Sequence, residues 1–119
     1  MSYKIAAASS DGKVVNQHFG RTKQFVIFEV NENGGYVFLE NRENAPPCNL
    51  GEHSTNAMLK AVDLLSDCKI VIVSQIGPVA EEVLNKKGIK AIVISDFIEN
   101  AITKIISYNA DDQEEQRNN

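Results

Sequence analysis

The residues of this chain best suited to chemistry are His18, Phe19, Gly20 and Arg21, which lie between two strand-like segments. A neutral imidazole can ligate iron, and a glycine allows a bulky ligand to approach the main chain. The fixed positive charge of Arg21 suits an anionic ligand. These residue types would suit an anionic, metal-containing ligand, but by themselves they do not carry a function and are equally typical of an ordinary loop.

A second group of candidate ligands is the pair Cys48 and His53, which follows Pro46-Pro47 in a glycine-containing loop. Thiolate and imidazole are soft ligands that suit iron or zinc, whereas magnesium prefers carboxylates. The same spacing also fits a loop cysteine and a histidine that flanks a helix. The sequence leaves open whether Cys48 and His53 converge with His18.

Two further features have competing interpretations. Cys68 immediately precedes an apolar strand, so we expect it to pack as a small hydrophobic residue rather than to complete a zinc site. Gly77-Pro78 begins an expected helix. The free N–H groups there can receive an anion, or the proline can simply start the helix.

The sequence argues against several enzyme classes. Two-metal nucleases need clustered carboxylates, and the first expected strand carries none. No GxGxxG or P-loop motif occurs, which argues against dinucleotide and nucleoside triphosphate sites. A thiol-dependent enzyme that uses Cys48 with His53 is a weaker hypothesis, because nothing in the sequence marks an orienting group or an oxyanion hole. We therefore expect a binding protein and not an enzyme.

Composition limits the remaining possibilities. The chain has 119 residues, which is enough for one domain with its own core. Its net charge of −4 argues against nucleic acid as a partner, and no apolar run is long enough to span a membrane. Because only two cysteines occur and no signal peptide is evident, we expect a cytoplasmic protein. We also expect a monomer.

Hydrophobic periodicity predicts an α/β fold. A strand and a two-stranded hairpin are followed by helix, strand, helix, strand and a final helix, and the hairpin turns at Asn33-Gly34-Gly35. The two crossovers that lead to strands favour parallel neighbours. We predict an RNase H-like, five-stranded mixed sheet of order 3-2-1-4-5 flanked by three helices. Strands are expected at 4–9, 25–30, 36–42, 69–74 and 89–94, and helices at about 54–65, 78–88 and 96–108.

Buried positions and domain limits follow from the same patterns. The strands at 69–74 and 89–94 are β-branched and apolar, which is typical of strands covered on both faces. Val79, Val83 and Leu84 are expected to be the buried face of the second helix. We assign residues 1–109 to a single domain and 110–119 to a disordered acidic tail, because the tail has almost no apolar content.

Taken together, these segments resemble the dinitrogenase iron–molybdenum cofactor biosynthesis family, which includes NifX-type carriers, the C-terminal domain of NifB and the cofactor-binding domain of NafY. The resemblance covers about residues 3–108. It lies in the ordered set of His18-Phe19-Gly20-Arg21, the strand at 25–30, Pro46-Pro47-Cys48 with Gly51-Glu52-His53, Asp67-Cys68 and Ile76-Gly77-Pro78.

The resemblance implies non-covalent binding and delivery of an iron–sulfur-based cluster, namely the iron–molybdenum cofactor, its precursor or a related cluster. It makes His18 the best candidate metal ligand, with Cys48 and His53 as secondary candidates and Arg21 facing the anionic cluster. Proteins that donate and accept the cluster would be the partners. The alternative is a regulatory or interaction domain of the same fold that binds no cluster.

Overall fold

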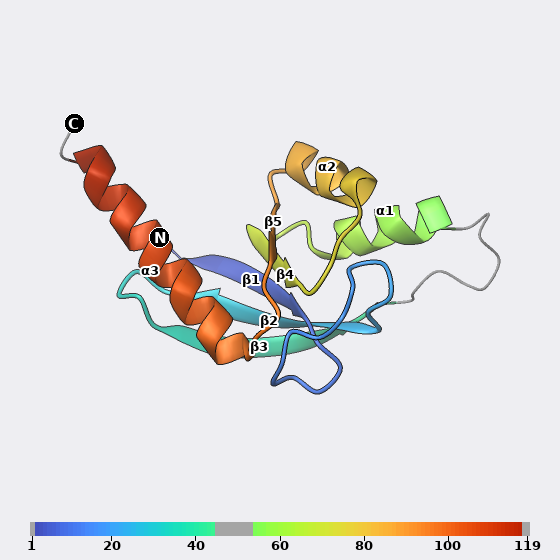
Figure 1. Ribbon diagram of the computed structural model, residues 1–119, viewed down its shortest axis with the longest axis horizontal. Coiled ribbons are helices and arrows are strands. Elements are labelled where there is room, and N and C mark those ends of the chain that lie inside the picture. Colours follow the sequence, from blue (N-terminus) through green and yellow to red (C-terminus); the bar gives the residue numbers. More distant parts are fainter. Residues whose placement is uncertain (1, 45–53, 118–119) are drawn as a thin grey trace.

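The computed structural model describes residues 2–44 and 54–117, and in these residues five strands form one mixed sheet of order β3-β2-β1-β4-β5 with three helices (Figure 1). This architecture confirms the fold predicted from the sequence. The elements are β1 (Tyr3–Ala8), β2 (Gln24–Val30), β3 (Tyr36–Glu43), α1 (Ser54–Leu64), β4 (Ile70–Val73), α2 (Pro78–Lys86), β5 (Lys90–Val93) and α3 (Ile98–Arg117).

The first three strands form an antiparallel meander. β1 pairs with β2 in the register Ile5↔Phe28, and β2 pairs with β3 through a hairpin. The hairpin turn places Gly34 at a φ of +86°, a conformation that glycine adopts without the steric cost of a side chain. The N–H of Asn31 donates to the carbonyl of Gly35 at 2.8 Å and closes the turn.

Two apolar clusters pack on opposite faces of the sheet, because successive strand side chains point to opposite sides. β4 is the buried centre of the parallel part, with β1 and β5 as its neighbours. One face, with α1 and α2, buries Ala6, Ala8, Phe25, Ile27, Val62, Leu65, Val71, Val73 and Leu84. The other face, with α3, buries Ile5, Ala7, Val26, Phe28, Ile70, Ile72, Ile98, Ala101, Ile102 and Ile105.

Three local expectations were wrong. β5 is not a strand covered on both faces: it lies at the edge of the sheet, and Val93 is 57% exposed. Val79 is 63% exposed, and α2 buries Leu84. α3, expected to end at about Tyr108, continues to Arg117. Its packed first turns supply the nucleus, and glutamate, glutamine and arginine then propagate a helix at little cost.

No helix in residues 2–44 and 54–117 is both long and apolar enough to cross a membrane.

A charged cluster ties three elements together on the α1 side. The Arg42 guanidinium of β3 donates to both carboxylate oxygens of Asp67, at 2.6 and 2.8 Å, and to the carbonyl of Leu64 at 2.9 Å. Lys4 Nζ of β1 donates to Asp67 Oδ2 at 2.9 Å. Hydrogen bonds from Arg42, and then from Lys4, hold the pKa of Asp67 well below its usual range. The cluster therefore joins β1, β3 and the turn that leads into β4.

We predict that Asp67→Asn lowers the free energy of unfolding by about 1 kcal/mol at pH 7, because partly exposed ion pairs contribute modestly. A depressed folded-state pKa contributes stability above the unfolded pKa, and that contribution is lost as pH falls through the folded pKa. The gap between wild type and Asp67→Asn should therefore narrow steadily below about pH 4. Urea unfolding at several pH values measures this gap, and a gap that widened toward low pH would contradict the assignment.

Candidate functional site

The segment that carries His18 lies at the carboxyl ends of β1 and β4. After β1 ends, the chain crosses this end of the sheet before it enters β2 at Gln24. In α/β sheets, ligands bind outside the carboxyl ends of parallel strands. The fold thus brings the predicted ligand to the end of the sheet where a binding site is expected.

Backbone hydrogen bonds fix this segment against the residues that follow β4. His18 forms a parallel bridge with Gln75. The N–H of Phe19 donates to the carbonyl of Gln75 at 2.9 Å, and the N–H of Ser74 donates to the carbonyl of Gln17 at 3.0 Å. The segment therefore continues the sheet for a few residues beyond β4 and is not an independent loop.

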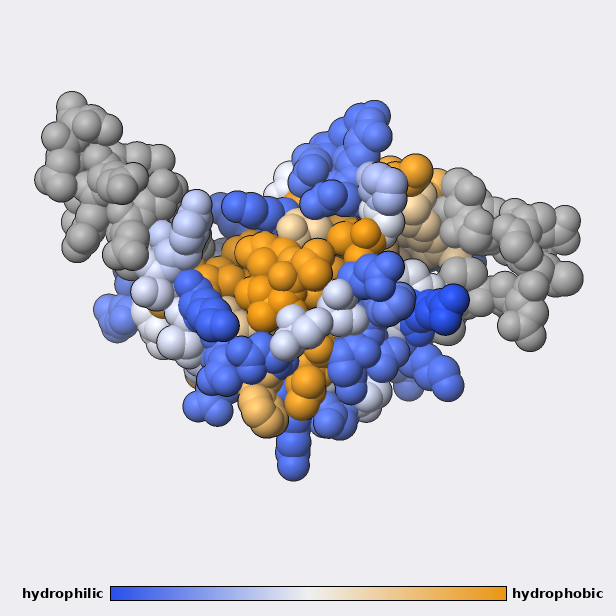
Figure 2. All heavy atoms as spheres, in the orientation of Figure 1, coloured by the Kyte–Doolittle hydropathy of each residue, from blue (hydrophilic) through white to orange (hydrophobic). Residues whose placement is uncertain are grey.

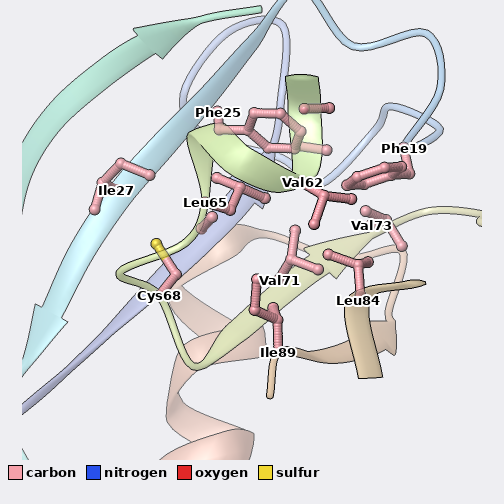
Figure 3. Packing of buried hydrophobic residues seen from close by; sticks show 13 residues of the cluster. Phe19, Phe25, Ile27, Val62, Leu65, Cys68, Val71, Val73, Leu84 and Ile89 are labelled. Atoms are coloured by element: carbon pink, nitrogen blue, oxygen red, sulfur yellow. The ribbon is translucent and has the colours of Figure 1, made fainter. Parts of the chain in front are cut away.

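Two buried apolar side chains anchor the segment that connects β1 to β2, one on each face of the sheet. Phe19 is 1% exposed in the α1–α2 cluster, and its ring centroid lies 5.8 Å from that of Phe25. Figure 3 shows the Phe19 ring directed into the cluster that contains Val73 and Leu84. Val15, also 1% exposed, packs in the α3 cluster. Phe19, predicted as a cofactor-binding residue, is thus a core residue that also lines the apolar hollow described below.

His18 and its two polar neighbours face outward. The imidazole of His18 is exposed, as are Gly20 and Arg21. The carbonyl of His18 accepts the N–H groups of Arg21 and Thr22, each at 3.1 Å, so the backbone turns tightly after the histidine. A Cβ built on Gly20 would meet nothing within 4 Å, which leaves the main chain open to a ligand there.

The exposed segment of residues 18–21 is called the ridge below. Two hollows adjoin it, one lined by Gly20 and the other by Arg21. The apolar hollow, of about 180 Å³, lies between the ridge and the starts of α1 and α2, and its lining includes Phe19, Gly20, Gly77 and Ala80. The polar hollow, of about 660 Å³, is lined by Ser9, Gln17, Arg21, Lys23, Gln24 and Glu43, and it shares Asn44 with the apolar hollow. His18 is not among the described residues that line either hollow, but its chain neighbours Gln17 and Phe19 line the polar and the apolar hollow, respectively. The arrangement can present the imidazole of His18 and the cations of Arg21 and Lys23 to a ligand near the apolar hollow.

Asn44 lines both hollows and was missed by the sequence analysis. Its side-chain amide donates to the carbonyl of Thr22 at 2.9 Å, and its N–H donates to the carbonyl of Lys23 at 2.8 Å. Thr22 is fully buried, and its hydroxyl donates to the carbonyl of Gln24 at 2.6 Å. The sequence offers one weak signal, an asparagine just after a strand, where its side chain commonly bonds nearby backbone.

Asp11 organises the start of the connection. Its Oδ1 accepts the N–H groups of Lys13 and Val14, at 2.8 and 3.1 Å, and the hydroxyl of Ser9 at 3.1 Å. The N–H of Lys13 and then that of Val14 lower the pKa of Asp11. The carboxylate of Asp11 is thus engaged by hydrogen bonds from nearby residues, and these bonds stabilise the turn at Gly12, whose φ is positive.

The other predicted ligands have different outcomes. Cys48 and His53 lie outside the described residues, so their convergence with His18 stays a prediction. Cys68 packs as a small hydrophobic residue, as expected, at 4% exposure. Burial, followed by the charge of Asp67, raises the pKa of its thiol to about 12. Among residues 2–44 and 54–117, no group of three or more histidine, cysteine, aspartate or glutamate side chains is placed to hold a metal ion.

Gly77 and Pro78, which the sequence marked as a helix start, do begin α2. Gly77 is extended and has no side-chain cap, and it lines the apolar hollow beside Gly20. The N-terminal end of α2 therefore lies next to the ridge, a placement that the sequence did not predict.

The sequence profile of the family described as dinitrogenase iron-molybdenum cofactor matches residues 1–108 of this chain. The chain belongs to this family. The resemblance found in the sequence motifs is thereby confirmed.

Two relatives show the range of the match. The FeMo cofactor biosynthesis protein NifB of Frankia alni is 32% identical over 104 residues, and protein NifX of Azotobacter vinelandii is 30% identical over 97 residues. These alignments cover 85% and 78% of this chain, 20% of NifB and 57% of NifX. The chain thus spans about a fifth of the length of the NifB proteins that it matches.

Solved structures share the fold. The apo form of the orange protein from Desulfovibrio gigas matches with a TM-score of 0.63 and 20% identity over 88% of both chains. A putative dinitrogenase from Methanocaldococcus jannaschii matches with a TM-score of 0.59 and 16% identity over 90% of both chains. At these identities the likeness supports the architecture alone.

We predict stability effects of very different size for two adjacent residues of the ridge. Phe19→Ala should cost about 3–5 kcal/mol of unfolding free energy, because it leaves a cavity in the core. His18→Ala should change it by less than about 0.5 kcal/mol, since the imidazole is exposed. Urea unfolding followed by circular dichroism measures both. Equal losses for the two variants would contradict the assignment of Phe19 as the anchor.

We also predict that Cys68 resists alkylation in the folded protein. The thiol is buried and its pKa of about 12 leaves almost no thiolate at pH 8. Treatment with iodoacetamide at pH 8, followed by peptide mass spectrometry, should find Cys68 unmodified in buffer and modified in 8 M urea. Equal modification in both conditions would show that the thiol is accessible and would reopen its candidacy as a ligand.

Proposed function

We propose that this chain binds an iron–sulfur-based metal cluster non-covalently and passes it between partner proteins, without a reaction of its own. The cargo is the iron–molybdenum cofactor, its iron–sulfur precursor or a related cluster. Membership of the dinitrogenase iron-molybdenum cofactor family supports this class of cargo. The observation that carries the proposal at residue level is the exposed imidazole of His18 on a segment fixed by the buried Phe19.

The chemistry of the ridge suits such a cargo. A cluster brings its own sulfide ligands, so the protein needs to supply few bonds, and His18 provides one nitrogen ligand of the kind that iron accepts. Arg21 and Lys23, which line the polar hollow, offer positive charge to an anionic cluster. The apolar hollow beside Phe19 and Gly20 offers a surface that excludes water.

Few ligands also suit delivery. A carrier must release its cargo, and a complex with one or a few protein bonds dissociates faster than one with a complete ligand set. Cys48 and His53 are proposed as additional ligands that join His18 when the cluster is bound. Proteins that supply and receive the cluster are the proposed partners.

The proposal predicts that His18→Ala weakens cluster retention at least about tenfold, because it removes the main protein ligand. Purified apo-protein is mixed anaerobically with isolated iron–molybdenum cofactor or its iron–sulfur precursor, desalted, and examined for iron content, visible absorption and EPR. The matched control is Lys87→Ala, an exposed position just after the opposite end of α2 from Gly77. It should retain cluster as wild type does.

Two outcomes would count against the proposal. Retention by His18→Ala equal to wild type would remove His18 as the main ligand. No retention of either cluster by wild type would favour the regulatory or interaction domain. Arg21→Ala adds a further check. It should retain less cluster than wild type, and the difference between the two should become smaller as added salt screens the charge of Arg21.

A further inference from the structure

An apolar groove lies on the α3 side of the parallel strands, away from the ridge. It has a volume of about 420 Å³ and is lined by Ile70, Ile92, Ile94, Ile105 and Tyr108. Figure 2 shows the corresponding apolar patch in the middle of this view, between α3 and α2 and framed by hydrophilic residues. Ile92 and Ile94 are partly buried and pack against the α3 cluster. Part of their apolar surface therefore remains exposed in the groove.

The groove exists because α3 leans toward the other half of the sheet. The helix buries Ile102 with β1 and β2 residues, and Ile106 lies near the Gly34 turn of the distant hairpin. On this face Ile70 and Ile72 of β4 are buried in the α3 cluster, whereas β5 has no helix of its own among the residues that the structure describes, and Ile92 and Ile94 are only partly buried. Parallel strands are normally covered by helices on both faces. The partly exposed surface at Ile92 and Ile94 lies where a further helix would cover β5 in such sheets.

Positive charge marks the edge of this groove. Lys90 and Lys104 both line it. Lys90 Nζ lies 5.9 Å from the centroid of the Tyr108 ring, and Lys104 Nζ lies 3.4 Å from Asp96 Oδ2. Lys90 is exposed and Lys104 is 66% exposed at its side chain, so both can reach a second partner. An incoming segment with carboxylates would meet complementary charge.

A second copy of this chain fits the groove poorly. Two copies joined around a two-fold axis along their β5 edges would place the same lysines of both copies on one continuous face. Like charges brought together in this way disfavour association.

We propose that this groove docks an amphipathic α-helix of a partner protein. The apolar face of that helix covers Ile92 and Ile94 beside α3, and its acidic residues contact Lys90 and Lys104. A helix is about 10 Å in diameter, which matches the spacing between a sheet and a helical layer. The docking surface is separate from the ridge at His18, so this proposal stands or falls independently of cluster binding.

The test uses two synthetic 18-residue helical peptides with the same leucine and alanine face. One has glutamate and the other has lysine at every polar position. Each is titrated into the ¹⁵N-labelled full chain at low salt and followed by NMR. The glutamate peptide should shift the amides of β5 and of residues 104–108 in a saturable way. The lysine peptide should bind at least about tenfold more weakly.

Charge variants localise the effect. Lys90→Glu should weaken binding of the glutamate peptide at least about tenfold, whereas Lys87→Glu, with the same change in net charge outside the groove, should not. Equal binding of the two peptides, no binding, shifts confined to other surfaces or insensitivity to Lys90→Glu would each overturn the proposal. Self-association in sedimentation that Lys90→Glu alters would assign the groove to a second copy and overturn it as well.

Discussion

Burial of Phe19 is the interaction on which the placement of the candidate site depends. The ring occupies the α1–α2 core, while the backbone of the same residue bonds to Gln75 beyond the end of β4. Val15 holds the other side of the connection in the α3 core. With both anchors in place, His18 projects from the end of the sheet on a fixed backbone and not from a free loop. A histidine whose position is set in this way loses less conformational entropy when it binds a ligand.

Much of the fold was predictable because the sheet is specified by local patterns. The hairpin at Gly34 and the two helical crossovers leave few arrangements of five strands, and the order 3-2-1-4-5 follows from them. The predicted order already placed β5 at an edge, but its apolar residues suggested cover on both faces, because composition alone does not show which part of a strand lacks a covering helix. The end of α3 at Arg117 was missed because apolar periodicity stops near residue 108, whereas a helix already packed on the sheet can continue through polar residues.

The placement of the candidate residues was predictable in part. Residue types marked His18 and Arg21 as candidates, and the family resemblance suggested the kind of cargo; both remain predictions. The sequence did not reveal that Phe19 is an anchor, since a phenylalanine beside a histidine suits a ligand pocket equally well. Asn44 and Gly77 lie far from His18 along the chain, and only the tertiary structure places them around the same ridge. Long-range neighbours of this kind are not encoded in local spacing.

The molecule carries two surfaces with proposed roles, the ridge at the carboxyl ends of β1 and β4 and the apolar groove on the α3 face. The central claim is that the imidazole of His18 bonds directly to the cargo. The most direct measurement is pulsed EPR on cluster-loaded protein with ¹⁵N-labelled histidine in a His53→Gln background, which leaves His18 as the single histidine of the chain. The account predicts a ¹⁵N coupling of the size expected for a nitrogen bonded to the cluster. A loaded, paramagnetic sample without that coupling would contradict it.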